Sequence, residues 1–210
     1  MESIGTFQVE SGKLAVTDPC YDREVWTRFP GERAFLGGVI DKVKNGEWEA
    51  FITMEKAGMW GDRVSNLVII HESVDHMDYD EQDIYEIADF EVGVDSGQAG
   101  FFDETSYPQD PRGEGGEYNK DAFYDECCHA TVGEDSRSKN AKGTHAGIIQ
   151  GRGCVSSSGY GDGGYACFVK RNTQGELIAA RIEYIGPEED EEDDEDLETD
   201  DEADEVEENG

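Results

Sequence analysis

The sequence predicts a mainly β, β-rich α+β fold, in which an antiparallel sandwich or open barrel carries one or two short helices. Short stretches of alternating apolar and polar residues recur along the chain, glycine-rich turns separate them, and few stretches have helical periodicity. The sequence also predicts two regions. A β-rich globular domain covers residues 1–187, and a disordered polyacidic C-terminal tail covers residues 188–210.

The first elements are predicted to form a β-hairpin. Residues 7–9 and 13–17 alternate apolar and polar side chains on either side of Ser11-Gly12. Pro19 has no backbone N–H and restricts the residue before it, so we expect the second strand to end at Asp18. A loop is predicted over the residues that follow, up to residue 36.

A second hairpin is predicted around Asn45-Gly46. Apolar stretches at residues 38–43 and 48–54 flank this pair, and Asn-Gly between two such stretches is a strong hairpin signal. A turn at residues 58–62 follows. The branched aliphatic side chains of residues 66–71 then indicate a buried strand.

The middle of the chain contains both predicted helices. Apolar residues on one side of residues 81–88 predict a short helix, and alternation over residues 90–94 predicts a strand after it. Residues 104–120 contain two prolines and three glycines, which is typical of a long loop. Asn119 is a suitable cap for a second helix that runs to about Ala130, with apolar residues spaced i, i+4 and i+7.

The rest of the domain is predicted to be rich in strands. One strand opens at Phe101-Phe102, and a polar loop covers residues 133–146. Further strands are predicted at residues 147–150, 153–157, 165–170 and 177–185, and Pro187 closes the domain.

The net charge of the chain favours some kinds of binding partner over others. The chain has 51 Asp and Glu against 17 Lys and Arg, a net charge of −34. The tail holds 17 of the 51 acids and no basic residue, so residues 1–187 retain 34 acids against all 17 basic residues. Direct attraction to DNA, RNA or an anionic membrane is therefore disfavoured, and basic partners or basic clefts are favoured.

The N-terminal residues, the apolar runs and the cysteines of the chain predict its localisation and its need for cofactors. The first residues have neither a basic segment nor an apolar core, and the longest aliphatic run, residues 67–70, is too short to span a bilayer, so we expect a soluble, cytoplasmic protein. The odd count of five cysteines favours reduced thiols, and the adjacent pair Cys127-Cys128 lacks metal-ligand spacing. No cofactor and no metal are expected.

The acidic tail has a charge spacing similar to that of DNA. Fully extended, its 23 residues reach about 75 Å, which places its charges about 4–5 Å apart, compared with about 3.4 Å along one DNA strand. A solubilising tail, a calcium-buffering tail and a simple solvated run of charge are the alternatives. The predicted partner-binding residues are Glu188, Glu189, Asp190, Glu191, Glu192, Asp193, Asp194, Glu195, Asp196, Glu198, Asp200, Asp201, Glu202, Asp204, Glu205, Glu207 and Glu208.

Motifs for catalysis are weak. Residues 159–164 match G-x-G-x-x-G, but strand-like residues follow where a dinucleotide site needs a helix, so we interpret them as a tight glycine turn. The serines at 156–158 lack the G-x-S-x-G pattern, and the four histidines have no ligand spacing. Asp95, Asp103 and Asp162 lie at or near glycine-rich turns, where aspartates bind a cation or, more often, cap the turn. No catalytic residue is predicted.

Three stretches resemble a known family. Residues 11–21 (SGKLAVTDPCY), 92–103 (VGVDSGQAGFFD) and 155–165 (VSSSGYGDGGY) are similar to the bacterial and phage family catalogued as domain of unknown function 4241. The resemblance implies one β-rich domain and no established activity. The long acidic extension departs from the usual family pattern.

The globular domain and the acidic tail together resemble the acidic host-takeover proteins of large lytic Bacillus phages. That resemblance implies a non-enzymatic DNA mimic that binds host RNA polymerase in its basic DNA channel, inhibits transcription, and binds neither nucleic acid nor membrane. Other DNA-binding proteins are further possible partners. Two alternative functions stay open: a small hydrolase or ligand-binding domain that uses the turns from Asp95 to Asp103 and from Ser156 to Tyr165, and an immunity-type module that binds a basic protein.

Overall fold

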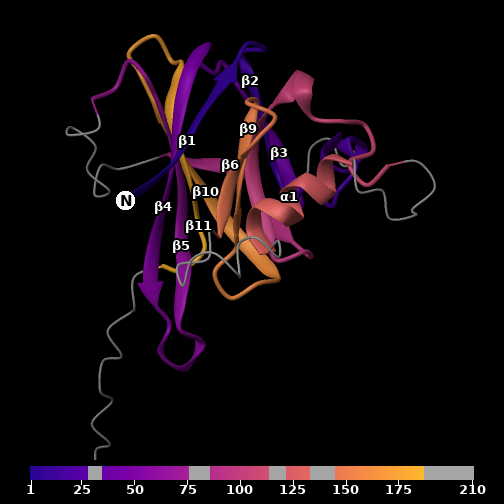
Figure 1. The fold of residues 1–210 in the computed structure, drawn as a ribbon. Helices are drawn as coiled ribbons and strands as arrows, with labels where there is room; N and C mark the ends of the chain where they lie inside the picture. Colours follow the sequence, from indigo (N-terminus) through magenta and orange to yellow (C-terminus); the bar gives the residue numbers. More distant parts are fainter. Residues whose placement is uncertain (28–34, 76–85, 114–121, 133–144, 187–210) are drawn as a thin grey trace, which may run out of the picture.

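The computed structural model describes residues 1–27, 35–75, 86–113, 122–132 and 145–186 (Figure 1). Within these ranges the chain forms eleven β-strands, three short 3-10 helices and one α-helix. The strands are β1 (Glu2–Val9), β2 (Lys13–Thr17), β3 (Gly37–Asp41), β4 (Gly46–Lys56), β5 (Asp62–His71), β6 (Glu86–Val94), β7 (Gln98–Asp103), β8 (Ala146–Ile149), β9 (Gly153–Ser157), β10 (Gly163–Arg171) and β11 (Leu177–Glu183). The helices are η1 (Arg23–Thr27), η2 (Gly58–Trp60), η4 (Glu104–Ser106) and α1 (Phe123–Val132).

The strands make two antiparallel sheets. The six-stranded sheet has the order β1-β4-β5-β11-β10-β6, and the five-stranded sheet has the order β3-β2-β7-β9-β8. The edge strands β1 and β8 contact each other, as do the edge strands β3 and β6. The two sheets therefore form a sandwich whose edges approach as in a barrel, which confirms the predicted fold class (Figure 1).

The main hydrophobic core lies between the sheets. Trp48, Leu67 and Phe101 are fully buried there, together with apolar residues from both sheets. Phe102, next to Phe101 on β7, points to the other face of its sheet because side chains alternate along a strand. On that outer face it packs against Phe123 of α1.

The helix α1 confirms the second predicted helix. Its buried residues Phe123 and Cys127 and the half-buried Ala130 carry the expected spacing and cover the outer face of the five-stranded sheet. The predicted cap at Asn119 lies outside the described residues. Of the other predicted helix, residues 81–85 lie outside them too, whereas residues 86–88 belong to β6, so that part of the prediction is wrong.

Both predicted N-terminal hairpins are wrong, although their strands exist. β1 pairs with β4, while β2 pairs with β3 and β7 in the other sheet. The chain also changes sheets between β3 and β4, through Asn45-Gly46. These two corners bond to each other, since the N–H of Gly12 donates to Asn45 Oδ1 at 2.8 Å and the N–H of Val43 donates to the Gly12 carbonyl at 2.9 Å.

The remaining strand predictions agree with the structure. The turn at residues 58–62 joins β4 to β5 in a hairpin, and β5 is the expected buried strand. The strands β8 to β11 lie where they were predicted, and β7 begins at Gln98, three residues before the predicted start. No helix in the described ranges is long and apolar enough to cross a membrane. All five cysteines lie within these ranges and are free thiols.

Candidate functional site

Three loops that are distant in the sequence lie side by side. They are residues 18–22 after β2, residues 95–97 between β6 and β7, and residues 158–162 between β9 and β10. The backbone N–H of Ser158 donates to the carbonyl of Gly97 at 3.0 Å, which joins the second loop to the third. These loops come from both sheets, so they form a junction across one end of the sandwich.

A buried carboxylate joins the first loop to the second. Asp18 is fully buried, and its Oδ2 accepts the backbone N–H groups of Asp95 (2.9 Å) and Ser96 (2.7 Å). Its Oδ1 accepts the N–H of Cys20 (2.8 Å) and the hydroxyl of Ser96 (2.6 Å). A buried carboxylate needs such partners, and here they fix the β6–β7 turn against the end of β2.

Tyr21 continues this connection towards the surface. Its hydroxyl donates to Asp95 Oδ2 at 2.7 Å, and its carbonyl accepts the hydroxyl of the buried Tyr107 at 2.7 Å. Burial raises the pKa of Tyr21, and the hydrogen bond to Asp95 raises it further. Tyr21 is therefore a neutral donor that holds the Asp95 carboxylate in place.

The third loop is the glycine turn predicted from the sequence. The hydroxyl of Tyr165 donates to the carbonyls of Ser158 (3.0 Å) and Gly161 (2.6 Å). Gly161 has a φ of +111°, which a residue with a side chain rarely adopts. A strand, β10, follows the turn directly where a dinucleotide site needs a helix, so the structure agrees with a tight turn rather than a nucleotide site.

An acidic hollow of about 400 Å³ lies beside the junction. Its carboxylates come from Glu91, Asp95 and Asp162, and its apolar wall comes from Phe35 and Leu36. The other lining residues are Tyr21, Gly93, Val94, Gly163 and Gly164. Among the described residues that line the hollow there is no Lys or Arg, so their chemistry suits a positively charged group.

The family comparison covers this whole arrangement. The model of the family described as "Protein of unknown function (DUF4241)" matches residues 7–182. The chain belongs to the DUF4241 family. No curated protein and no solved structure matches it. The three stretches that carry the family resemblance, residues 11–21, 92–103 and 155–165, contain the second and third loops of the junction and all of the first except Asp22.

Asp103 of this DUF4241 protein lies away from Asp95, because β7 separates the two residues. Asp103 is fully buried, and its Oδ2 accepts the N–H groups of Glu10 (2.6 Å) and Ser11 (3.0 Å). Its Oδ1 accepts the N–H and the hydroxyl of Thr105. Burial alone would raise the pKa of Asp103, but these hydrogen bonds, that from the Thr105 side chain foremost, lower it below its ordinary value.

The Cys20 and Cys154 thiols and the Ser156 hydroxyl of the DUF4241 domain are packed or hydrogen-bonded within the fold. Burial raises the pKa of Cys20, with the Asp18 carboxylate adding to the effect, and burial raises that of Cys154 to about 12. The hydroxyl of Ser156 is buried and donates to Tyr184 Oη at 3.1 Å. In the described ranges, no three His, Cys, Asp or Glu side chains are grouped to hold a metal ion.

Part of this site was predictable. The alternative hypothesis of a small hydrolase or ligand-binding domain used the turns that carry Asp95 and Asp162, and both residues line the acidic hollow. No role was predicted for Asp18, although an aspartate two residues before a bonded N–H, here that of Cys20, is a typical turn signal. The 17 predicted partner-binding acids, which lie between residues 188 and 208, are outside the described residues.

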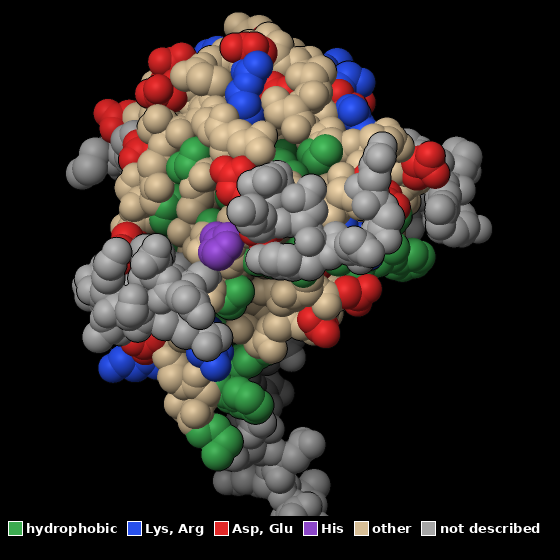
Figure 2. All heavy atoms as spheres, turned by 45° about the vertical axis from the view of Figure 1, so that its right-hand side comes forward, with side chains coloured by type: hydrophobic (Ala, Val, Ile, Leu, Met, Phe, Trp, Pro, Cys, Tyr) green, Lys and Arg blue, Asp and Glu red, His purple; other side chains and the backbone are tan. Residues whose placement is uncertain are grey.

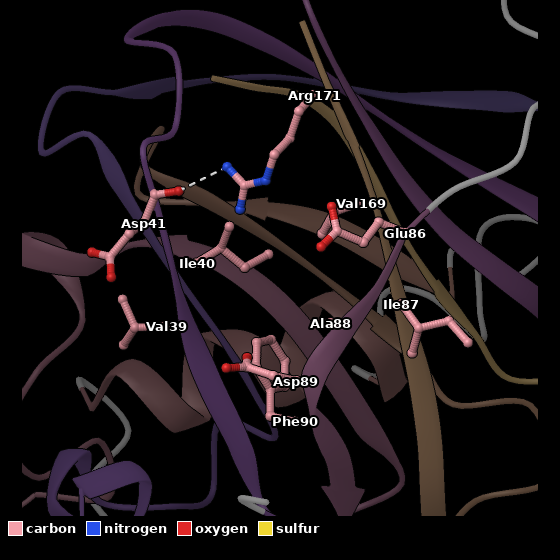
Figure 3. A pocket seen from close by; sticks show the side chains of 10 residues that line it. All are labelled: Val39, Ile40, Asp41, Glu86, Ile87, Ala88, Asp89, Phe90, Val169 and Arg171. Atoms are coloured by element: carbon pink, nitrogen blue, oxygen red, sulfur yellow. Dashed lines mark hydrogen bonds between the residues drawn. The ribbon is translucent and has the colours of Figure 1, made fainter. Parts of the chain in front are cut away.

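A second hollow, of about 280 Å³, lies where the edge strands β3 and β6 meet (Figure 3). The guanidinium of Arg171 donates from Nη1 to the carbonyls of Asp41 and Gly175, both at 3.1 Å. The hollow is lined by Val39, Ile40, Asp41, Glu86, Ile87, Ala88, Asp89, Phe90, Val169 and Arg171. It contains charges of both signs, and therefore lacks the single charge preference of the acidic hollow.

Proposed function

We propose that this protein is a phage DNA mimic that binds host RNA polymerase in its DNA channel and inhibits host transcription in the host cytoplasm. The observation that carries the proposal is the composition of residues 188–210, with 17 carboxylates among 23 residues and no basic residue. A polymerase channel holds phosphates with Lys and Arg side chains, and these would pair with carboxylates spaced at nearly the phosphate repeat.

The folded domain supports a role for the tail as the effector. Residues 1–187 have twice as many acidic as basic residues, 34 against 17, so the domain adds to the attraction of a basic channel. Its buried carboxylates Asp18 and Asp103 are occupied in holding loops together. The charges available to a partner are therefore the exposed acids of the domain and those of residues 188–210.

A transcription assay with purified bacterial RNA polymerase tests the proposal. Full-length protein is compared with a variant that ends at Pro187, over a range of salt concentrations. We expect that only the full-length protein inhibits and that high salt relieves the inhibition, because screening weakens contacts between charges. If the truncated variant inhibits without the tail, or if neither protein inhibits, the tail is not the effector.

Neutralising the tail provides the matched control. One variant replaces a single tail acid by its amide, and another replaces about half of them. Since the attraction is to a repeated phosphate path, we expect the single change to have little effect and the second to abolish binding. Equal inhibition by wild type and the half-neutralised variant would contradict DNA mimicry.

The acidic hollow supports a second candidate function, a ligand-binding or hydrolytic domain. The supporting observation is that Asp95 and Asp162, predicted as candidates from separate turns, line the same hollow with Tyr21. Its charge favours a small ligand with an ammonium or guanidinium group. Asp162→Ala should then abolish function without unfolding the domain, whereas tail neutralisation should not. Loss of partner binding after other surface changes in the domain, but not after tail removal, would instead favour an immunity-type module.

A further inference from the structure

The hairpin between β4 and β5 ends in exposed apolar side chains. Met59 is 95% exposed, Trp60 62% and Met54 39%, and we call these three residues the hairpin tip. The hairpin projects beyond the rest of the sandwich, and hydrophobic side chains gather at this lower end of the molecule (Figures 1 and 2). Large apolar side chains that are exposed together at one end of a molecule are typical of an interaction surface.

The backbone of the tip is already ordered. The N–H of Ala57 donates to the carbonyl of Gly61 at 2.9 Å, and the N–H of Trp60 donates to that of Ala57 at 3.0 Å. Gly58 and Gly61 supply the left-handed conformations of this turn, with φ of +54° and +74°. A loop fixed by its own hydrogen bonds loses little conformational entropy on binding, so it presents Met59 and Trp60 at low cost.

The chain leaves the described domain beside this hairpin. The backbone N–H groups of Tyr184 and Ile185 both donate to the carbonyl of Ser65, at 2.8 and 3.2 Å. Ser65 is the fourth residue of β5, which begins directly after the tip. Gly186, the last described residue before the acidic segment, follows Ile185 directly. The apolar tip and Ile185, two residues before Pro187, therefore lie at the same end of the six-stranded sheet.

The net charge of the chain favours one of the possible binding partners of the tip over the others. A net charge of −34 repels a second copy of the chain and an anionic membrane, whereas it attracts a protein with a basic surface. Trp and Met are enriched at the centres of protein interfaces, and Trp is among the commonest residues whose truncation weakens binding strongly.

We infer that the hairpin tip inserts into an apolar pocket of the protein partner, next to the basic channel that takes the acidic residues. This inference rests on the proposed function, and it adds a second contact of different chemistry. The acidic residues provide attraction to any basic channel, which is not selective. Trp60 and Met59 provide a contact that depends on the shape of the partner, and they select one basic protein among many.

The two contacts respond differently to salt. Carboxylates paired with Lys and Arg lose affinity steeply as salt rises, whereas burial of an apolar side chain is little affected. Removing the tip should therefore lower affinity by the same factor at every salt concentration. Neutralising acids should instead reduce the slope of log affinity against log salt.

Binding of the full-length protein to purified bacterial RNA polymerase tests the inference, measured from about 50 to about 300 mM NaCl. We expect Met59→Ala combined with Trp60→Ala to weaken binding about 30-fold or more at each salt concentration, without a change of slope. Met59→Leu with Trp60→Phe should stay within about threefold of wild type because it keeps the apolar surface. Ile87→Ala, at the opposite edge of the six-stranded sheet and 57% exposed in the native protein, should bind as wild type does.

The outcomes separate this inference from the function on which it rests. Wild-type affinity in the tip variant, together with lost binding in the half-neutralised variant, would overturn the inference and leave the proposed function standing. No binding by the wild type would remove both. A dimer in sedimentation that the tip variant loses, or tip-dependent binding to phosphatidylcholine vesicles, would assign the tip to another occupant and overturn the inference.

Discussion

Two buried aspartates hold the loops of this domain in the same way. Asp18 follows and Asp103 ends a strand of the five-stranded sheet, and each accepts four hydrogen bonds from backbone N–H and hydroxyl groups. Each connects segments more than 70 residues apart in the chain, 77 for Asp18 with Asp95 and 93 for Asp103 with Glu10. A carboxylate with all these acceptor positions used is a structural group rather than a free acid or base.

Removal of the Asp18 carboxylate should destabilise the domain. Asp18→Ala leaves the N–H groups of Cys20, Asp95 and Ser96 without their acceptor, and we expect the free energy of unfolding to fall by about 3 kcal/mol. Urea denaturation followed by circular dichroism measures this. Asp162→Ala is the control, because Asp162 is exposed and its truncation should change the value by less than about 0.5 kcal/mol. Equal losses in the two variants would contradict the role of Asp18.

Asp103 should make the stability of the domain depend on pH in acid. Its pKa is lowered in the folded state, so its contribution is complete above the ordinary value of 3.8 and is lost as pH falls through the folded pKa. We therefore expect the difference in unfolding free energy between wild type and Asp103→Asn to be constant near neutral pH and to shrink below about pH 4. Urea denaturation across this pH range tests it. A difference that stays constant throughout would show that the charge of Asp103 contributes nothing.

At the scale of the elements, the corner between β3 and β4 depends on a glycine in a crowded position. Gly46 has a φ of +136°, and an added Cβ would lie 2.8 Å from His71 Nε2. Gly61 also has a positive φ, +74°, but an added Cβ there would meet nothing within 4 Å. Substitution of Gly61 therefore tests backbone strain by itself, whereas substitution of Gly46 tests backbone strain together with steric crowding.

We expect Gly46→Ala to lower the free energy of unfolding by about 2–3 kcal/mol and Gly61→Ala by about 1 kcal/mol. Thermal and urea unfolding of the two variants provide the measurement. The larger loss at residue 46 arises because His71, which bonds through its ring to Asn45 and Ser73, cannot move away freely. Equal losses would mean that the corner accommodates a methyl group.

The strands were predictable from the sequence, and their partners were less so. The run of branched aliphatic residues at 66–71 placed β5 correctly, because both faces of this strand are buried, and the apolar stretches between turns placed β8 to β11. The chain changes direction at both Ser11-Gly12 and Asn45-Gly46, yet each segment leads into the other sheet. What redirects them are bonds to distant residues, such as Glu10 N–H to Asp103, which local sequence does not reveal.

At the scale of the whole molecule, the candidate site was only partly predictable. The alternative of a ligand-binding domain grouped the turns that carry Asp95, Asp103 and Asp162. Asp95 and Asp162 share the acidic hollow because the loop that carries Ser158 bonds to Gly97, whereas Asp103 lies elsewhere. The hairpin tip was predicted only as a turn, because the exposure of Met59 and Trp60 depends on how far the hairpin extends beyond its neighbours.

The high negative charge should also make the stability of the whole protein depend on salt. Repulsion among like charges opposes the compact state and is screened as salt rises, so we expect the Tm of the full-length protein to increase by about 2–4 °C between about 20 and about 200 mM NaCl. The variant ending at Pro187 should show a smaller increase, since it lacks 17 of the 51 acids. Calorimetry of both proteins measures this, and identical increases would confine the repulsion to the domain.

The position of β11 has a consequence for how the protein is made. This last strand lies at the centre of the six-stranded sheet, between β5 and β10. While the ribosome is still synthesising residues before Leu177, the sheet is split into two halves, and both inner edges lack their partner. The nascent chain can complete its core only after β11 has emerged, so premature termination between Arg171 and Leu177 leaves two unpaired, aggregation-prone strand edges.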